Sequence, residues 1–115
     1  MQQPTIDPGR MDALQAISHR ARSAMEAAQD DVSAEMDRAA ALRRDIQNVQ
    51  RQIERAPGEN LSKRLIALKA DQKRLGKKIE ALNLDAEIAR ERYAAASRLA
   101  KRCAEFVSAE TEVSQ

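Results

Sequence analysis

The chain has 115 residues, a net charge of +2 at pH 7, and only one Phe, one Tyr and no Trp. So few aromatic side chains exclude a thick globular core, whereas 33% charged residues and frequent Ala, Arg and Glu are typical of long helices. One cysteine excludes an internal disulfide and favours a reducing compartment, and no apolar run reaches the roughly 18 residues of a transmembrane segment.

The first predicted element is a long helix over about residues 8–56, preceded by an extended N-terminal segment, residues 1–7. Asp7 is a favourable N-cap, because its carboxylate accepts backbone N–H groups and Pro8 has no N–H to leave unpaired. Within the helix, apolar residues recur at alternating intervals of four and three, the spacing of helices that supercoil. These seam positions are 14, 18, 21, 25, 28, 32, 35, 39, 42, 46, 49, 53 and 56.

A predicted turn over residues 57–60 separates this helix from a second one over about residues 61–109. Pro57 ends the first helix by biasing Ala56 away from helical angles, and Asn60 is the expected N-cap of the second. The same spacing then resumes at positions 61, 65, 68, 72, 75, 79, 82, 86, 89, 93, 96, 100, 103 and 107. Residues 110–115 form a polar C-terminal tail outside this pattern.

The two repeats mirror each other about the turn, which predicts that the chain folds back on itself. In heptad notation, positions 14 and 61 are d, positions 18 and 65 are a, and each letter recurs every seven residues. If the chain folds back at the turn, each d residue should face the d residue whose number brings the sum to 117, as Val49 faces Leu68. Each a residue should face the a residue that brings the sum to 118, as Met25 faces Tyr93. We therefore predict an all-α fold, a long two-helix antiparallel coiled-coil hairpin that forms a single domain over residues 8–109. The alternative is a parallel or extended oligomer in which the break is only a kink.

Two seam positions carry polar residues. Glu35 at d is expected to face Leu82, and Gln72 at a is expected to face Ile46. A polar seam residue either fixes the register or oligomeric state, at a cost in stability, or extends along the edge of the seam to reach water. We favour the second interpretation, with Met36 turned inward beside Glu35.

Toward the two termini the seam becomes thin, because alanine replaces larger residues in pairs such as Ala28–Ala89. Alanine buries much less apolar surface than leucine. Large apolar residues also recur outside the seam at helical spacing, and they form a predicted docking base: Ile17, Leu84, Ile88, Leu99 and Phe106. This Ala-rich base predicts packing against further helices, from a second copy or another protein. The alternative is that scattered exposed apolar residues have no binding role.

Charge is unevenly distributed along the chain. Residues 37–78 hold 12 basic and 5 acidic residues, whereas the remainder holds 8 basic and 13 acidic residues, which suggests a basic tip and an acidic base. Like charges four residues apart, as in Lys69 and Lys73, each cost roughly 0.2–0.5 kcal/mol in an isolated helix, so a bound anion would relieve them. The predicted anion-binding or partner-binding tip is Arg43, Arg44, Arg51, Arg55, Lys63, Arg64, Lys69, Lys73, Arg74, Lys77 and Lys78.

The ligand of the basic tip has three alternatives: an acidic protein surface, nucleic-acid phosphates, or solvent alone. No aromatic residue lies in the tip to stack on bases, so sequence-specific reading of nucleic acid is not expected. Gly76 would allow a phosphate to approach closely, although a lone helical glycine is more often simply tolerated.

The sequence gives no support for catalysis, and we expect no enzyme activity, no cofactor, no metal site and no small-molecule substrate. The one histidine, His19, falls at an outward b position, and Cys103 falls at a buried d position opposite Leu14. A Cys–His nucleophile pair needs hydrogen-bond contact, and a metal site needs clustered ligands. The chain also has no glycine-rich phosphate-binding loop.

In outline the chain is similar to secreted helical hairpins of the WXG type, but Pro57-Gly58-Glu59-Asn60 stands where those proteins have Trp-x-Gly. It also looks like the hairpin stalk proteins of type III export machines and the small helical subunits of bacteriophage virions. We therefore expect a structural or adaptor subunit of a larger assembly, cytoplasmic or incorporated into a virion, with protein partners, self or hetero-oligomeric. Alternatives are a nucleic-acid-binding coiled coil and a small inhibitor or chaperone that masks a partner's groove. We expect no signal peptide and no membrane insertion.

Overall fold

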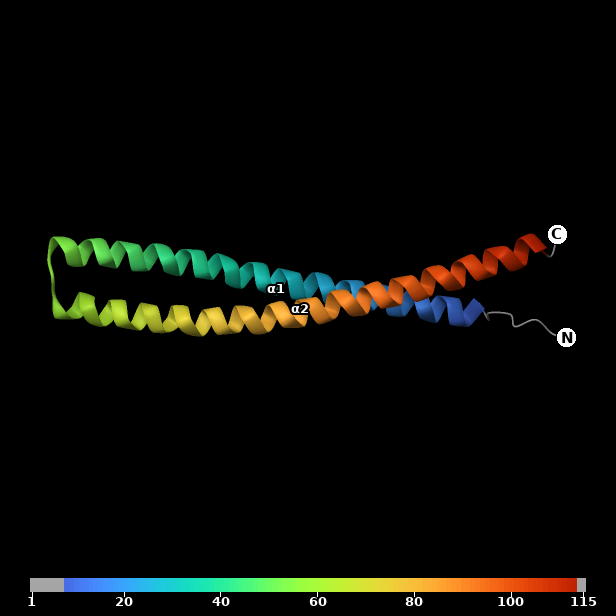
Figure 1. The fold of residues 1–115 in the computed structure, drawn as a ribbon, viewed down its shortest axis with the longest axis horizontal. Helices are drawn as coiled ribbons and strands as arrows, with labels where there is room; N and C mark the ends of the chain where they lie inside the picture. The colour runs from blue at the N-terminus through green and yellow to red at the C-terminus, as the bar shows by residue number, and fades with distance from the viewer. Residues whose placement is uncertain (1–7, 114–115) are drawn as a thin grey trace. The chain divides into compact units, whose positions relative to one another are not determined.

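The computed structural model describes the backbone of residues 8–113 and the side chains of residues 9–109, and it is an all-α helical hairpin (Figure 1). Helix α1 spans Pro8–Arg55 and helix α2 spans Glu59–Val113. The predicted fold class is therefore confirmed. The predicted N-cap Asp7 and the rest of segment 1–7 lie outside the described residues.

The turn between the helices is shorter than predicted and uses a different cap. The Ala56 N–H still donates to the Gln52 carbonyl at 2.9 Å, although α1 ends at Arg55. Helix α2 begins at Glu59, and the Ser62 N–H donates to the Gly58 carbonyl at 3.1 Å. Because the N-cap carbonyl accepts the first bond of a helix, Gly58 is the N-cap and the prediction of Asn60 is wrong.

Local chemistry explains this earlier start of α2. Glycine is tolerated at the N-cap, and Glu59 places a carboxylate in the first turn, where the helix dipole favours negative charge. At its other end α2 continues to Val113, so residues 110–113 of the predicted tail are helical. Residues 114 and 115 lie outside the described part of the chain.

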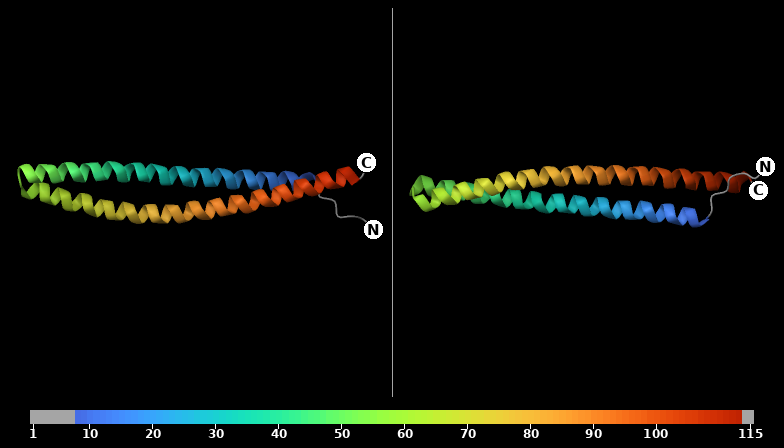
Figure 2. Two further views of the ribbon diagram at one scale, coloured as in Figure 1. Left: turned by 45° about the horizontal axis from the view of Figure 1, so that its top comes forward. Right: turned by 90° about the horizontal axis from the view of Figure 1, so that it is seen from below.

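The chain divides into two compact units, each made from part of both helices. The turn unit is Gln29–Asp85, and in it the end of α1 and the start of α2 run antiparallel from the turn (Figure 1). The terminal unit comprises, among described residues, 8–28 of α1 and 86–113 of α2. These two segments run alongside each other in opposite directions (Figure 2).

The burial of side chains follows the predicted seam. Every predicted seam position is buried or half-buried except Ala56 and Gln72, which are exposed. Outside the predicted seam, only three residues within 9–109 are half-buried: Met11, Ala40 and Ser97. Met11 is itself an a position. The heptad periodicity therefore identifies the face that each helix buries.

The two units differ in how deeply they bury this seam. In the turn unit, Ile46 is 7% exposed and Val49 is 2% exposed, and these two form the buried apolar core. In the terminal unit no described side chain is buried, and its seam residues reach only half-burial. Alanine pairs explain the difference, because a small side chain leaves much of its neighbours accessible to water.

No helix in the described residues holds an apolar stretch that would cross a membrane.

Candidate interaction surfaces

A buried carboxylate with two cationic partners lies in the seam of the turn unit. Oε1 of Glu35 accepts hydrogen bonds from Lys78 Nζ at 3.0 Å and from Arg38 Nη1 at 3.3 Å. Arg38 comes from the same helix, whereas Lys78 reaches across from α2. Both cations occupy g positions, immediately before an a position of the seam. Glu35 therefore links the two helices by a charge-assisted hydrogen bond.

The preferred interpretation of Glu35 is wrong. The residue is 8% exposed, so its carboxylate does not extend into water, and Met36 beside it is 49% exposed rather than turned inward. Two cations within hydrogen-bond distance make this burial tolerable, since an unpaired buried charge is very costly. Oε2 of Glu35 is buried without a hydrogen-bond partner. The corresponding prediction for Gln72 is confirmed, because that side chain is exposed.

The predicted basic tip lies on the surface of the turn unit, and all eleven of its cations are exposed. Three of them have acidic partners: Lys63 lies 3.3 Å from Glu59, Arg74 lies 3.0 Å from Asp71, and Lys78 binds Glu35. Among the described residues, the other eight tip cations form no ion pair. The exposed pairs Lys63–Glu59 and Arg74–Asp71 contribute little to stability. With eight cations outside any ion pair, most of the positive charge of the tip is available to a ligand.

The acidic excess outside residues 37–78 does not lie in the terminal unit. The terminal segments 1–28 and 86–115 hold eight cations and eight acids. The turn unit instead carries five acids outside residues 37–78 and no cation there: Asp30, Asp31, Glu35, Glu80 and Asp85. Within this unit, acidic residues therefore follow the basic tip along both helices.

The predicted docking base is exposed but belongs to both units. In the terminal unit, Ile17, Ile88, Leu99 and Phe106 are between 43% and 51% exposed. Leu84 is also exposed, but it belongs to the turn unit. The structure adds Ile66 in the turn unit, which is 70% exposed and which lies outside the predicted base. The terminal unit thus combines four exposed large apolar side chains with a seam that has no buried residue.

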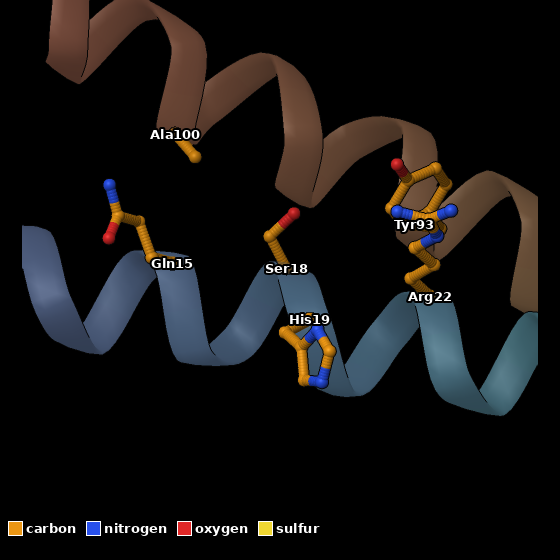
Figure 3. Close-up of a pocket in the computed structure, with 6 residues that line it drawn as sticks. All are labelled: Gln15, Ser18, His19, Arg22, Tyr93 and Ala100. Carbon is orange, nitrogen blue, oxygen red and sulfur yellow. The ribbon is translucent and has the colours of Figure 1, made fainter.

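A surface hollow of about 190 Å³ lies between the helices of the terminal unit (Figure 3). Its lining residues are Gln15, Ser18, His19, Arg22, Tyr93 and Ala100. Figure 3 shows Gln15 and Ser18 pointing from α1 toward α2, Ala100 pointing back toward α1, and His19 pointing away from α2. The Arg22 guanidinium donates to Glu26 at 3.1 Å, so its charge is already partnered.

The hollow is not arranged for nucleophilic or metal chemistry. His19 is exposed, as predicted, and Cys103 is half-buried and does not line the hollow. Within the described part of the chain, no three His, Cys, Asp or Glu side chains converge to hold a metal ion.

Comparison with known proteins finds no matching family model, no similar curated protein and no similar solved structure.

Proposed function

We propose that this chain is a non-enzymatic structural or adaptor subunit of a larger protein assembly, of the bacteriophage virion or export apparatus type, that docks through its terminal unit. The observation that carries this proposal is the contrast between the two units. The turn unit has a buried core, whereas the terminal unit buries no described side chain and exposes four large apolar ones.

The energetics favour a partner for the terminal unit. A fully buried Leu, Ile or Phe side chain contributes about 1.5–3 kcal/mol relative to an exposed one. Ile17, Ile88, Leu99 and Phe106 are each about half exposed, so a partner that covered them would add roughly 1 kcal/mol per side chain. A few such anchors at the centre of an interface commonly supply most of its binding energy.

The basic tip supports a second contact, with an acidic protein surface. Eight exposed cations without an ion pair create a positive field that favours an acidic partner and accelerates its association. Nucleic acid is the other candidate ligand for this field. Titration of labelled duplex and single strands at two salt concentrations separates the two: absence of binding at low salt removes nucleic acid, and a steep salt dependence supports it.

The docking proposal is tested on the protein in its native assembly. Light scattering of material purified gently from its source should give a mass well above 12.8 kDa. The double variant Leu99→Ser/Phe106→Ser should be recovered as a folded chain outside the assembly. Ile66→Ser, which changes an exposed residue of the turn unit, is the matched control and should remain incorporated. Incorporation of all three proteins to the same extent, or a native mass of one chain, would refute the proposal.

A further inference from the structure

The hollow marks one side of the seam of the terminal unit. Ser18 and Ala100 are both a positions, and both line the hollow from opposite helices (Figure 3). Gln15 and Arg22, the other inward-lining residues of α1, are e positions. The hollow therefore lies on the e side of the seam.

The opposite side of the seam carries the exposed apolar residues. Ile17 and Leu99 immediately precede Ser18 and Ala100, so both are g positions. In an antiparallel helix pair the g positions of the two helices lie on the same side of the seam. The turn unit shows this directly, because Arg38 and Lys78, both at g, bind one oxygen of Glu35. Ile17 and Leu99 therefore share one surface, which we name the g flank.

The g flank of the terminal unit consists of its g positions and the adjoining c positions, 13 residues within 9–28 and 86–109. Four of them are the large apolar residues Ile17, Ile88, Leu99 and Phe106, and five are alanines. The remaining four are all arginines. All 13 are exposed.

No acidic residue lies on the g flank among these described positions. The five acids of the same segments, from Asp12 to Glu105, all occupy b or f positions. The g and c rows therefore hold four arginines among the apolar residues and no carboxylate: Arg10, Arg20, Arg92 and Arg102. This surface is apolar with four interspersed arginines, and the neighbouring f positions of α2 include Glu91 and Glu105.

The composition of the g flank selects among possible occupants. A second copy of the chain would bring arginines against arginines, which an interface disfavours. The alanines leave shallow holes between the larger side chains of the g flank. Side chains of a facing helix fill such holes by knobs-into-holes packing. A lipid surface has no projecting side chains to use them. The arginines favour carboxylates on the facing surface.

We propose that the g flank of the terminal unit binds an amphipathic helix of a partner protein whose apolar stripe is bordered by Asp and Glu. This proposal rests on the proposed docking function and names the chemistry of the partner. The partner helix adds a third helix to the terminal unit, covers Leu99 and Phe106, and pairs its carboxylates with the arginines of the g flank.

The test uses the full chain and two fluorescent peptides of four heptads with leucine and alanine at a and d. One peptide has Glu at every e and g position, and the other has Lys at these positions. The Glu peptide should bind at least tenfold more tightly than the Lys peptide. Its affinity should fall at least tenfold in the variant Arg92→Glu/Arg102→Glu, which reverses two charges of the g flank.

The matched control is Arg90→Glu/Lys101→Glu, which makes the same change of charge on the same helix at e and b positions. Its affinity for the Glu peptide should match that of the unmodified chain, and circular dichroism should show that both variants remain helical. Equal losses in the two double variants, or equal affinity for the two peptides, would overturn the proposal. A chain that dimerises without binding either peptide, or that binds only phosphatidylserine vesicles, would also overturn it.

These outcomes are distinct from a failure of the docking function. The double variant Leu99→Ser/Phe106→Ser could be absent from the native assembly while the unmodified chain binds the Glu and Lys peptides with equal affinity. In that case the terminal unit docks, but its partner is not an acidic helix. If that variant stays in the assembly, the docking function itself fails.

Discussion

Glu35 binds Lys78 and Arg38 through one oxygen, at 3.0 and 3.3 Å, and its other oxygen has no hydrogen-bond partner. The two cations occupy g positions on the same side of the seam and both lie close to one oxygen, where like charges repel. The carboxylate between them offsets that repulsion. The cluster therefore links α1 to α2 at one register, but it is a weak source of stability because one buried oxygen remains unsatisfied.

Replacing Glu35 by leucine should stabilise the turn unit. Glu35→Leu removes the unsatisfied oxygen and fills a d position with an apolar side chain, so the free energy of unfolding should rise by about 1 kcal/mol or more. Lys78→Ala should lower it by about 1 kcal/mol, a discounted value because the Lys78 side chain is 55% exposed. Urea unfolding followed by circular dichroism measures both. A destabilised Glu35→Leu variant would contradict this account of the cluster.

Val49 is the most deeply buried apolar side chain among the described residues, at 2% exposure. Val49→Ala should lower the free energy of unfolding by about 2 kcal/mol, through lost burial of two methyl groups and the cavity that remains. The control Ile66→Ala removes more atoms from a side chain that is 70% exposed, and it should change stability by about 0.5 kcal/mol or less. Similar losses in the two variants, measured by urea unfolding, would show that the core does not lie at Val49.

Gly76 interrupts the long helix α2 without a structural need for glycine. Its φ is not positive, and a Cβ placed there meets nothing within 4 Å. Gly76→Ala should therefore raise the free energy of unfolding by about 1 kcal/mol, because alanine has the higher helix propensity. Ala70→Gly, at another exposed position of α2, should lower it by a similar amount. If Gly76→Ala destabilises the protein, Gly76 has a packing or binding role that the structure does not explain.

At the level of the helices, the heptad periodicity of the sequence predicted the main features of the fold. The heptad spacing identified both helices, their antiparallel pairing and nearly every half-buried seam position. It did not identify the cap of α2, because Gly58 and Asn60 are both acceptable caps and hydrogen-bond geometry decides between them. It also misjudged Glu35, because the burial of this residue depends on a lysine 43 positions away in the sequence.

The candidate surfaces were predicted less completely than the fold. The exposed apolar residues of the terminal unit could be read from their spacing outside the seam. Their common surface with the arginines was not predicted, although it follows from the heptad positions once the two helices are known to be antiparallel. Leu84 illustrates the limit, since helical spacing grouped it with Ile88 although the two residues belong to different compact units.

In the molecule as a whole, the turn unit holds its own core, whereas we propose that the terminal unit needs a partner. The turn unit contains the buried residues Ile46 and Val49 and the link from Lys78 to Glu35. The terminal unit has a seam of alanine and half-buried residues. Local opening of a helix costs less free energy where fewer apolar contacts are lost, so the two units should differ in how often they open.

Hydrogen exchange of the isolated chain, followed by mass spectrometry, measures this difference directly. Amides of residues 40–55 and 65–80 should exchange more slowly than those of residues 11–25 and 90–107. Addition of the Glu peptide should slow exchange in the second pair of segments and leave the first pair unchanged. Equal protection in the two units without peptide, or slower exchange in the terminal unit, would contradict the claim that the terminal unit depends on a partner.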